Sequence, residues 1–97
     1  MNYIMQVVIT DPNTREGMTS SLYFELECSF EYNPRQYGNG YYLSIQGKGF
    51  SPQAFDLRYD KSFNPDKKVE WLAEWAKFYW SGKNGAWKVK TLEIMKV

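Results

Sequence analysis

The chain has 97 residues, of which 43% are hydrophobic and 19% aromatic, and its formal net charge is +1. This length predicts a single domain over residues 1–97, and the apolar content excludes an intrinsically disordered chain. No segment approaches the ~20 consecutive apolar residues of a membrane-spanning helix, so we expect no membrane partner.

The chain has no histidine and only one cysteine, and both facts limit the catalytic and metal-binding chemistry that it can carry. Without histidine the commonest general base and neutral metal ligand are both missing, so we expect no catalytic site, no metal and no cofactor. One cysteine, Cys28, cannot form an internal disulfide, which favours a reducing compartment, the cytoplasm. Cys28 is in phase with Leu26 and Phe30, so we expect it to be buried and inert.

Charge is divided unevenly along the chain. Residues 1–47 carry two basic and five acidic residues, a net charge of −3, whereas residues 48–97 carry ten basic and six acidic residues, a net charge of +4. The pI of about 7.8 is below that of a typical nucleic-acid-binding domain. The split still allows a basic patch on one side of the fold.

The first half of the chain has the composition of strands. Residues 3–10 are β-branched and apolar, which predicts a strand buried on both faces, followed by a turn at Pro12 and a loop over 14–21. Residues 22–32 alternate between apolar and polar side chains, which is the period of a strand with one face in the core. The outward positions of that strand include three carboxylates: Glu25, Glu27 and Glu31.

Glycine and proline divide the middle of the chain. Residues 34–40 are rich in both and predict a long loop. Residues 41–50 predict the next strand. Ser51-Pro52-Gln53 then reads as a tight connection to an alternating strand over 54–60. Short connections favour antiparallel neighbours.

The last third predicts one helix and a final strand. Asn64 is a good N-cap, Pro65 suits the first helical position, and the helix is expected to run to about Ser81 and end at Gly82. Asn84-Gly85 predicts a turn. The strand over 87–97 changes the phase of its alternation, which predicts a bulge near Thr91. The predicted fold is therefore α+β, a mainly antiparallel sheet of four to five strands with one aromatic-rich helix packed on one face, in the order β-β-β-β-α-β.

The helix carries more apolar surface than one sheet needs. On a helical wheel one apolar arc is formed by Val69, Leu72, Ala73, Ala76, Tyr79 and Trp80. Trp71, Trp75 and Phe78 widen the apolar sector to roughly 220°, against the ~100° typical of a surface helix. Either loops of the same chain or another molecule must cover these three side chains.

Two binding hypotheses follow. The first is a small non-enzymatic interaction domain that binds a protein partner, by default a second copy in a homodimer, through Trp71, Trp75 and Phe78 and through Arg35 and Tyr37 of the 34–40 loop. The alternative is a single-stranded nucleic-acid-binding protein. Its phosphate-binding and base-stacking residues would cluster around the turn after the helix: Lys83, Trp87, Lys88 and Lys90.

Overall fold

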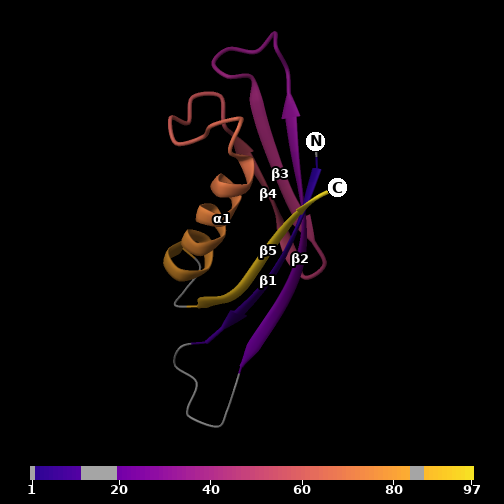
Figure 1. Ribbon diagram of the computed structural model, residues 1–97, viewed down its shortest axis with the longest axis vertical. Coiled ribbons are helices and arrows are strands. Elements are labelled where there is room, and N and C mark those ends of the chain that lie inside the picture. The colour runs from indigo at the N-terminus through magenta and orange to yellow at the C-terminus, as the bar shows by residue number, and fades with distance from the viewer. Residues whose placement is uncertain (1, 12–19, 84–86) are drawn as a thin grey trace.

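The computed structural model describes residues 2–11, 20–83 and 87–97 (Figure 1). Its elements, in chain order, are β1 (Asn2–Thr10), β2 (Ser21–Tyr32), β3 (Tyr41–Gly47), β4 (Phe50–Asp56), α1 (Lys68–Phe78), a π-helical turn (Tyr79–Lys83) and β5 (Lys88–Lys96). The five strands form one antiparallel sheet in the order β4-β3-β2-β1-β5. The predicted α+β class and the order β-β-β-β-α-β are confirmed.

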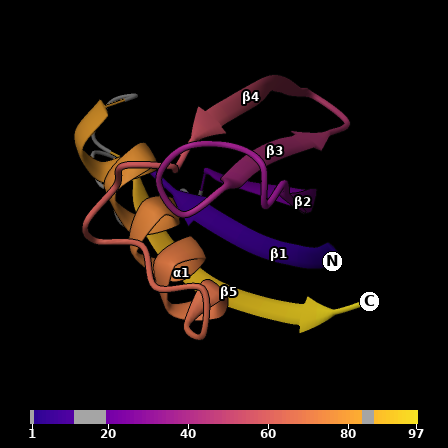
Figure 2. The same ribbon diagram turned by 90° about the horizontal axis from the view of Figure 1, so that it is seen from above.

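One face of the sheet is covered by α1, as the view from above shows (Figure 2). On β1 this face presents four buried side chains: Tyr3, Met5, Val7 and Ile9. Helix α1 contributes Leu72 and Ala76 to the same core, and the π-helical turn contributes Trp80. The alternate residues of β1 are only half-buried, so the prediction that this strand is buried on both faces is wrong. The chain has one helix in its described part, and a single helix covers a single face.

Strand β2 follows its predicted alternation. Leu26, Cys28 and Phe30 are buried, and Glu25 and Glu27 are exposed. Burial raises the pKa of the Cys28 thiol to about 12, with a smaller contribution from the nearby Glu27 charge. A thiol with such a pKa remains protonated and unreactive at neutral pH. The prediction that Cys28 is a buried core residue is confirmed.

Strand β4 begins earlier than the sequence suggests. The prediction placed a connection at 51–53 and a strand over 54–60, but the turn is at Lys48-Gly49 and the strand spans Phe50–Asp56. Gly49 has a φ of 74°, which glycine adopts without strain. Pro52 is tolerated in β4 for two reasons: the strand is at the sheet edge, and its pairing with β3 shifts register next to this residue. At such positions no backbone N–H is needed for strand pairing.

Helix α1 is shorter than predicted at its start. Asn64 does not cap the helix, because its side-chain oxygen accepts a hydrogen bond from the Asp66 N–H at 2.9 Å and its carbonyl accepts one from the Lys67 N–H at 2.8 Å. These bonds form a separate turn that includes Pro65. The helix then begins at Lys68.

The end of the helix also differs from the prediction, because the chain continues through Gly82 in a π-helical turn. The contact with the sheet follows Leu72, Ala76 and Trp80. Val69, predicted to be in the buried arc, is 38% exposed because that contact begins one turn later, at Leu72.

The predicted bulge in the last strand is confirmed. In the pairing of β1 with β5, Val8 is opposite Thr91 and Ile9 is opposite Val89, so Lys90 is the extra residue. The predicted turn at Asn84-Gly85 and most of the predicted loop over 14–21 are outside the described residues. Within the described residues, no helix has the length and apolar content needed to cross a membrane.

Candidate functional site

The three aromatic residues that wind around the outside of α1 are only partly covered by their own chain. Trp71 packs edge-on against Phe55 of β4 and Phe63, with ring centroids 6.0 and 6.2 Å apart. Trp75 packs against Phe55 at 5.9 Å and Phe50 at 6.4 Å. Both tryptophans are half-buried.

Phe78 differs from the two tryptophans because it is 64% exposed. A phenyl ring with this exposure leaves a large apolar area in contact with water. The loops and strand β4 therefore cover part of the surplus apolar surface of α1, and the Phe78 ring remains exposed to solvent.

A groove of about 410 Å³ runs along this side of α1. Trp71, Trp75 and Phe78 form its apolar floor. The loop before the helix provides one wall with Asp60, Ser62 and Asn64, and a charged rim is formed by Lys67, just before α1, and by Glu70 and Glu74 of α1. We call this feature the α1 groove. The structure thus brings together the three predicted aromatic residues and adds six polar residues that the sequence analysis did not assign to a site.

Asp60 fixes the wall of the α1 groove. Its carboxylate accepts hydrogen bonds from the Ser62 hydroxyl and from the Ser62 N–H, the latter at 2.8 Å. The hydrogen bond from the Ser62 hydroxyl is the main cause that lowers the pKa of Asp60; burial opposes it, and the Ser62 N–H and the neighbouring Trp71 add smaller lowering contributions. The Asp60 carboxylate beside Trp71 therefore stays ionised at neutral pH.

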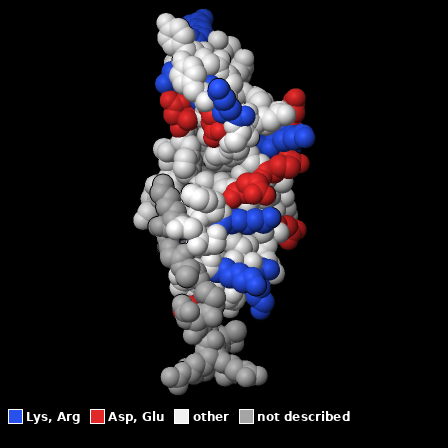
Figure 3. Space-filling view, turned by 90° about the vertical axis from the view of Figure 1, so that its left-hand side faces the viewer, with Lys and Arg blue, Asp and Glu red and all other residues white. Residues whose placement is uncertain are grey.

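Charged side chains of both signs cover the helix side of the molecule, beside an uncharged area (Figure 3). On α1 itself, Glu74 and Lys77 form an exposed ion pair at 3.9 Å. Glu70 is exposed and makes no ion pair within the described residues. The wall and rim of the α1 groove together therefore carry three carboxylates, those of Asp60, Glu70 and Glu74, and one ammonium group, that of Lys67.

The 34–40 loop forms a different surface from the α1 groove. Tyr37 is 78% exposed and Arg35 is also exposed, at the end of the hairpin formed by β2 and β3 (Figure 1). Arg58 anchors the loop. Its guanidinium donates a hydrogen bond to the Gln36 side-chain oxygen at 3.2 Å and forms a bidentate ion pair with Asp56. The structure does not bring Arg35 and Tyr37 together with Phe78.

The residues of the nucleic-acid hypothesis are only partly assembled. Trp87 and Lys88 line a hollow of about 440 Å³ together with Lys77, Ser81 and Val89. Trp87 is half-buried, and its backbone N–H donates to the Trp80 backbone carbonyl at 3.2 Å. Lys90, the bulge residue, is exposed but does not line this hollow, and the side chain of Lys83 is outside the described part. Lys77, from the last turn of α1, was not anticipated.

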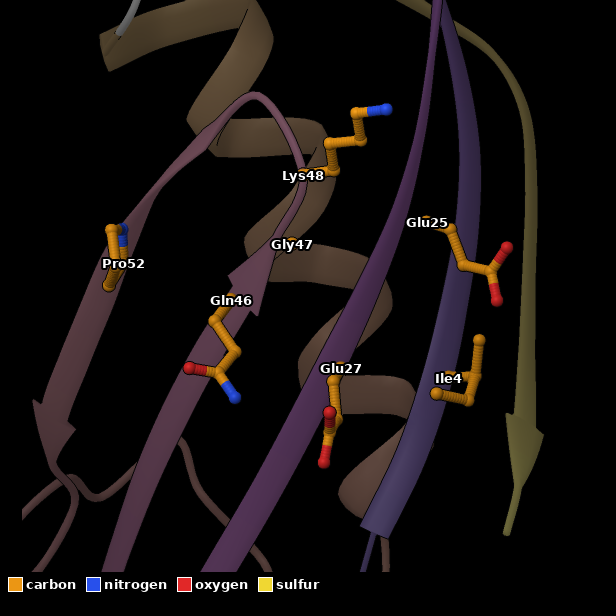
Figure 4. A pocket seen from close by; sticks show the side chains of 7 residues that line it. All are labelled: Ile4, Glu25, Glu27, Gln46, Gly47, Lys48 and Pro52. Atoms are coloured by element: carbon orange, nitrogen blue, oxygen red, sulfur yellow. The ribbon is translucent and has the colours of Figure 1, made fainter.

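The open face of the sheet carries a second, shallow hollow of about 570 Å³ (Figure 4). Glu25, Glu27 and Gln46 point away from α1 there, and Ile4 from β1 adjoins them. Glu31 lines a separate hollow with Tyr42 and Asp56, so the three glutamates of β2 do not converge. Within residues 2–11, 20–83 and 87–97, no three carboxylate or cysteine side chains gather as metal ligands.

No protein-family model, no curated protein and no solved structure matches the chain. The geometry of the α1 groove is therefore the basis for a functional proposal.

Proposed function

We propose that this protein is a small non-enzymatic binding domain that docks a segment of another protein chain in the α1 groove. The observation that carries the proposal is the exposure of Phe78, 64%, at the end of a floor made by Trp71 and Trp75. Aromatic anchors of this kind dominate the binding energy of protein interfaces because they bury a large area at a small entropic cost.

The structure sharpens the choice of test residue. Trp71 and Trp75 also pack against Phe55, so their replacement would destabilise the domain as well as the groove. Phe78 is the better probe, because its side chain is mostly in solvent. Tyr23, 57% exposed on the open face of β2, is a matched control for the loss of an exposed ring.

The first experiment is the mass in solution across a concentration series for the wild type, Phe78→Ser and Tyr23→Ser. A dimer that dissociates only in Phe78→Ser supports a second copy as the partner. If the protein is monomeric, a displayed library of random peptides supplies candidate segments. Binding of the selected peptides must then weaken at least about tenfold in Phe78→Ser and remain unchanged in Tyr23→Ser. Equal binding to all three proteins would contradict the proposal.

A second candidate function is single-stranded nucleic-acid binding at the hollow lined by Lys77, Trp87 and Lys88, because two ammonium groups there adjoin an indole ring. Phosphate contacts by lysine make such binding steeply dependent on salt. Titration with single-stranded oligonucleotides at low and high salt tests it, and Lys77→Gln/Lys88→Gln should weaken binding. Absence of binding at low salt would end this candidate.

A further inference from the structure

The wall and rim of the α1 groove have an excess of negative charge, because three carboxylates, those of Asp60, Glu70 and Glu74, face one ammonium group, that of Lys67. The Asp60 carboxylate accepts its hydrogen bonds from a neutral donor, Ser62. Glu70 makes no ion pair in the described part of the chain, and Glu74 meets Lys77 only at 3.9 Å in an exposed pair. Exposed pairs of this kind neutralise little, because water screens them.

The floor of the groove favours a cation for a separate reason. Indole and phenyl rings carry negative charge on their faces, and ammonium or guanidinium groups bind there, most strongly over tryptophan. A groove lined both by Trp71 and Trp75 and by carboxylates combines both attractions. Its volume of about 410 Å³ is sufficient for one long side chain and the apolar part of a neighbour.

We propose that the α1 groove binds a partner segment through an arginine or lysine side chain that lies over Trp71 and Trp75 and faces the carboxylates of Asp60, Glu70 and Glu74. The inference rests on the proposed docking function and names the chemistry of the partner. A second copy of this chain fits less well. A two-fold contact centred on the groove would bring two linings with an excess of carboxylates together, and like charges oppose such a contact.

The test uses the full chain and peptides selected from a random displayed library. We expect the selected peptides to contain arginine or lysine beside an apolar residue. Replacing that basic residue by glutamine should weaken binding to the wild-type protein about tenfold, the combined effect of a cation–π contact and an ion pair. The affinity should also fall as salt is raised, because the rim charges are exposed.

A charge-matched pair of variants locates the effect. Glu70→Gln/Glu74→Gln should weaken binding several-fold and reduce the loss caused by replacing the basic residue of the peptide. Glu25→Gln/Glu27→Gln removes the same charge from the open face of the sheet and should leave binding unchanged. If the two double variants behave alike, the attraction is a general charge effect and the inference is wrong.

Failure of this inference and failure of the docking function give different results. If peptides bind the wild type equally well without their basic residue, but bind Phe78→Ser more weakly, the proposed cation contact is wrong and the docking site stands. Peptides indifferent to Phe78→Ser overturn both. A library without binders also overturns both, unless the protein dimerises through Phe78, in which case only the basic partner is wrong.

Discussion

The two faces of the sheet come from the same strands and differ sharply. On β1, Met5 is fully buried beneath α1, whereas its neighbour Ile4 is half-exposed on the other side. On β2, Leu26 is buried and the adjacent Glu25 and Glu27 are in solvent. Alternation along a strand sends successive side chains to opposite faces, so the presence of one helix converts a sequence pattern into two environments.

This difference explains where the surplus aromatic surface of α1 lies. The centre of the covered face is filled by Leu72, Ala76 and Trp80. Trp71 and Trp75 reach the edge strand β4, where Phe55 meets both. The surplus therefore extends the core along the covered face as far as the edge strand β4, and the open face stays uncovered by α1.

The largest expected effect is a difference in stability between substitutions on the two faces of β1. Met5→Ala should lower the free energy of unfolding by about 3 kcal/mol, because it leaves a cavity in a closed core. Ile4→Ala should cost only about 1 kcal/mol, since the side chain is half in water and leaves no cavity. Urea unfolding of both variants tests this pair, and equal losses would show that the open face is covered in solution.

The next effect concerns the edge of the covered face. Trp75→Ala should lower the free energy of unfolding by about 2 kcal/mol, because it removes half-buried area and the ring contacts with Phe50 and Phe55. Phe78→Ser, one turn further along, should change it by less than about 0.5 kcal/mol. A large loss in Phe78→Ser would mean that this ring belongs to the core and is not available for docking.

A smaller effect is expected from acid. Hydrogen bonds lower the folded-state pKa of Asp60, so its contribution to stability is present above the unfolded pKa of about 4 and is lost as the pH falls through the folded value. Asp60→Asn should cost less than about 1 kcal/mol at pH 7, because solvent screens this carboxylate. The difference between wild type and variant should shrink below about pH 4 in unfolding curves. A constant difference would assign the effect to lost packing.

The smallest effect belongs to the open face. Glu25→Gln/Glu27→Gln should change the free energy of unfolding by less than about 0.5 kcal/mol, since both side chains are exposed. The variant therefore serves as a control for net charge. A clear stabilisation on raising the pH in the wild type, absent from the variant, would reveal an interaction of these carboxylates that the fold does not explain.

Several features of the fold could be predicted because local pattern and tertiary structure agree. The alternation of β2 places Cys28 in the core, and the change of phase in β5 predicts a bulge near Thr91, which the structure has at the adjacent Lys90. The start of α1 could not be predicted from Asn64 alone. A good N-cap residue is also a good turn residue, and here its side chain closes a turn with Asp66. Likewise Pro52 interrupts a central strand but not an edge strand, and the sequence does not state which strand is at the edge.

The candidate site, like the fold, has features that the sequence predicts and features that only the tertiary structure determines. The spacing of Trp71, Trp75 and Phe78 by itself determined that one side of the helix carries more apolar surface than a sheet requires. Only the tertiary structure decided how much of it is shared with Phe55 and Phe63, and that Asp60 becomes a wall of the groove. The physical reason is that helical periodicity fixes which side chains share a face, whereas the packing of distant segments fixes which of those side chains remain in contact with water.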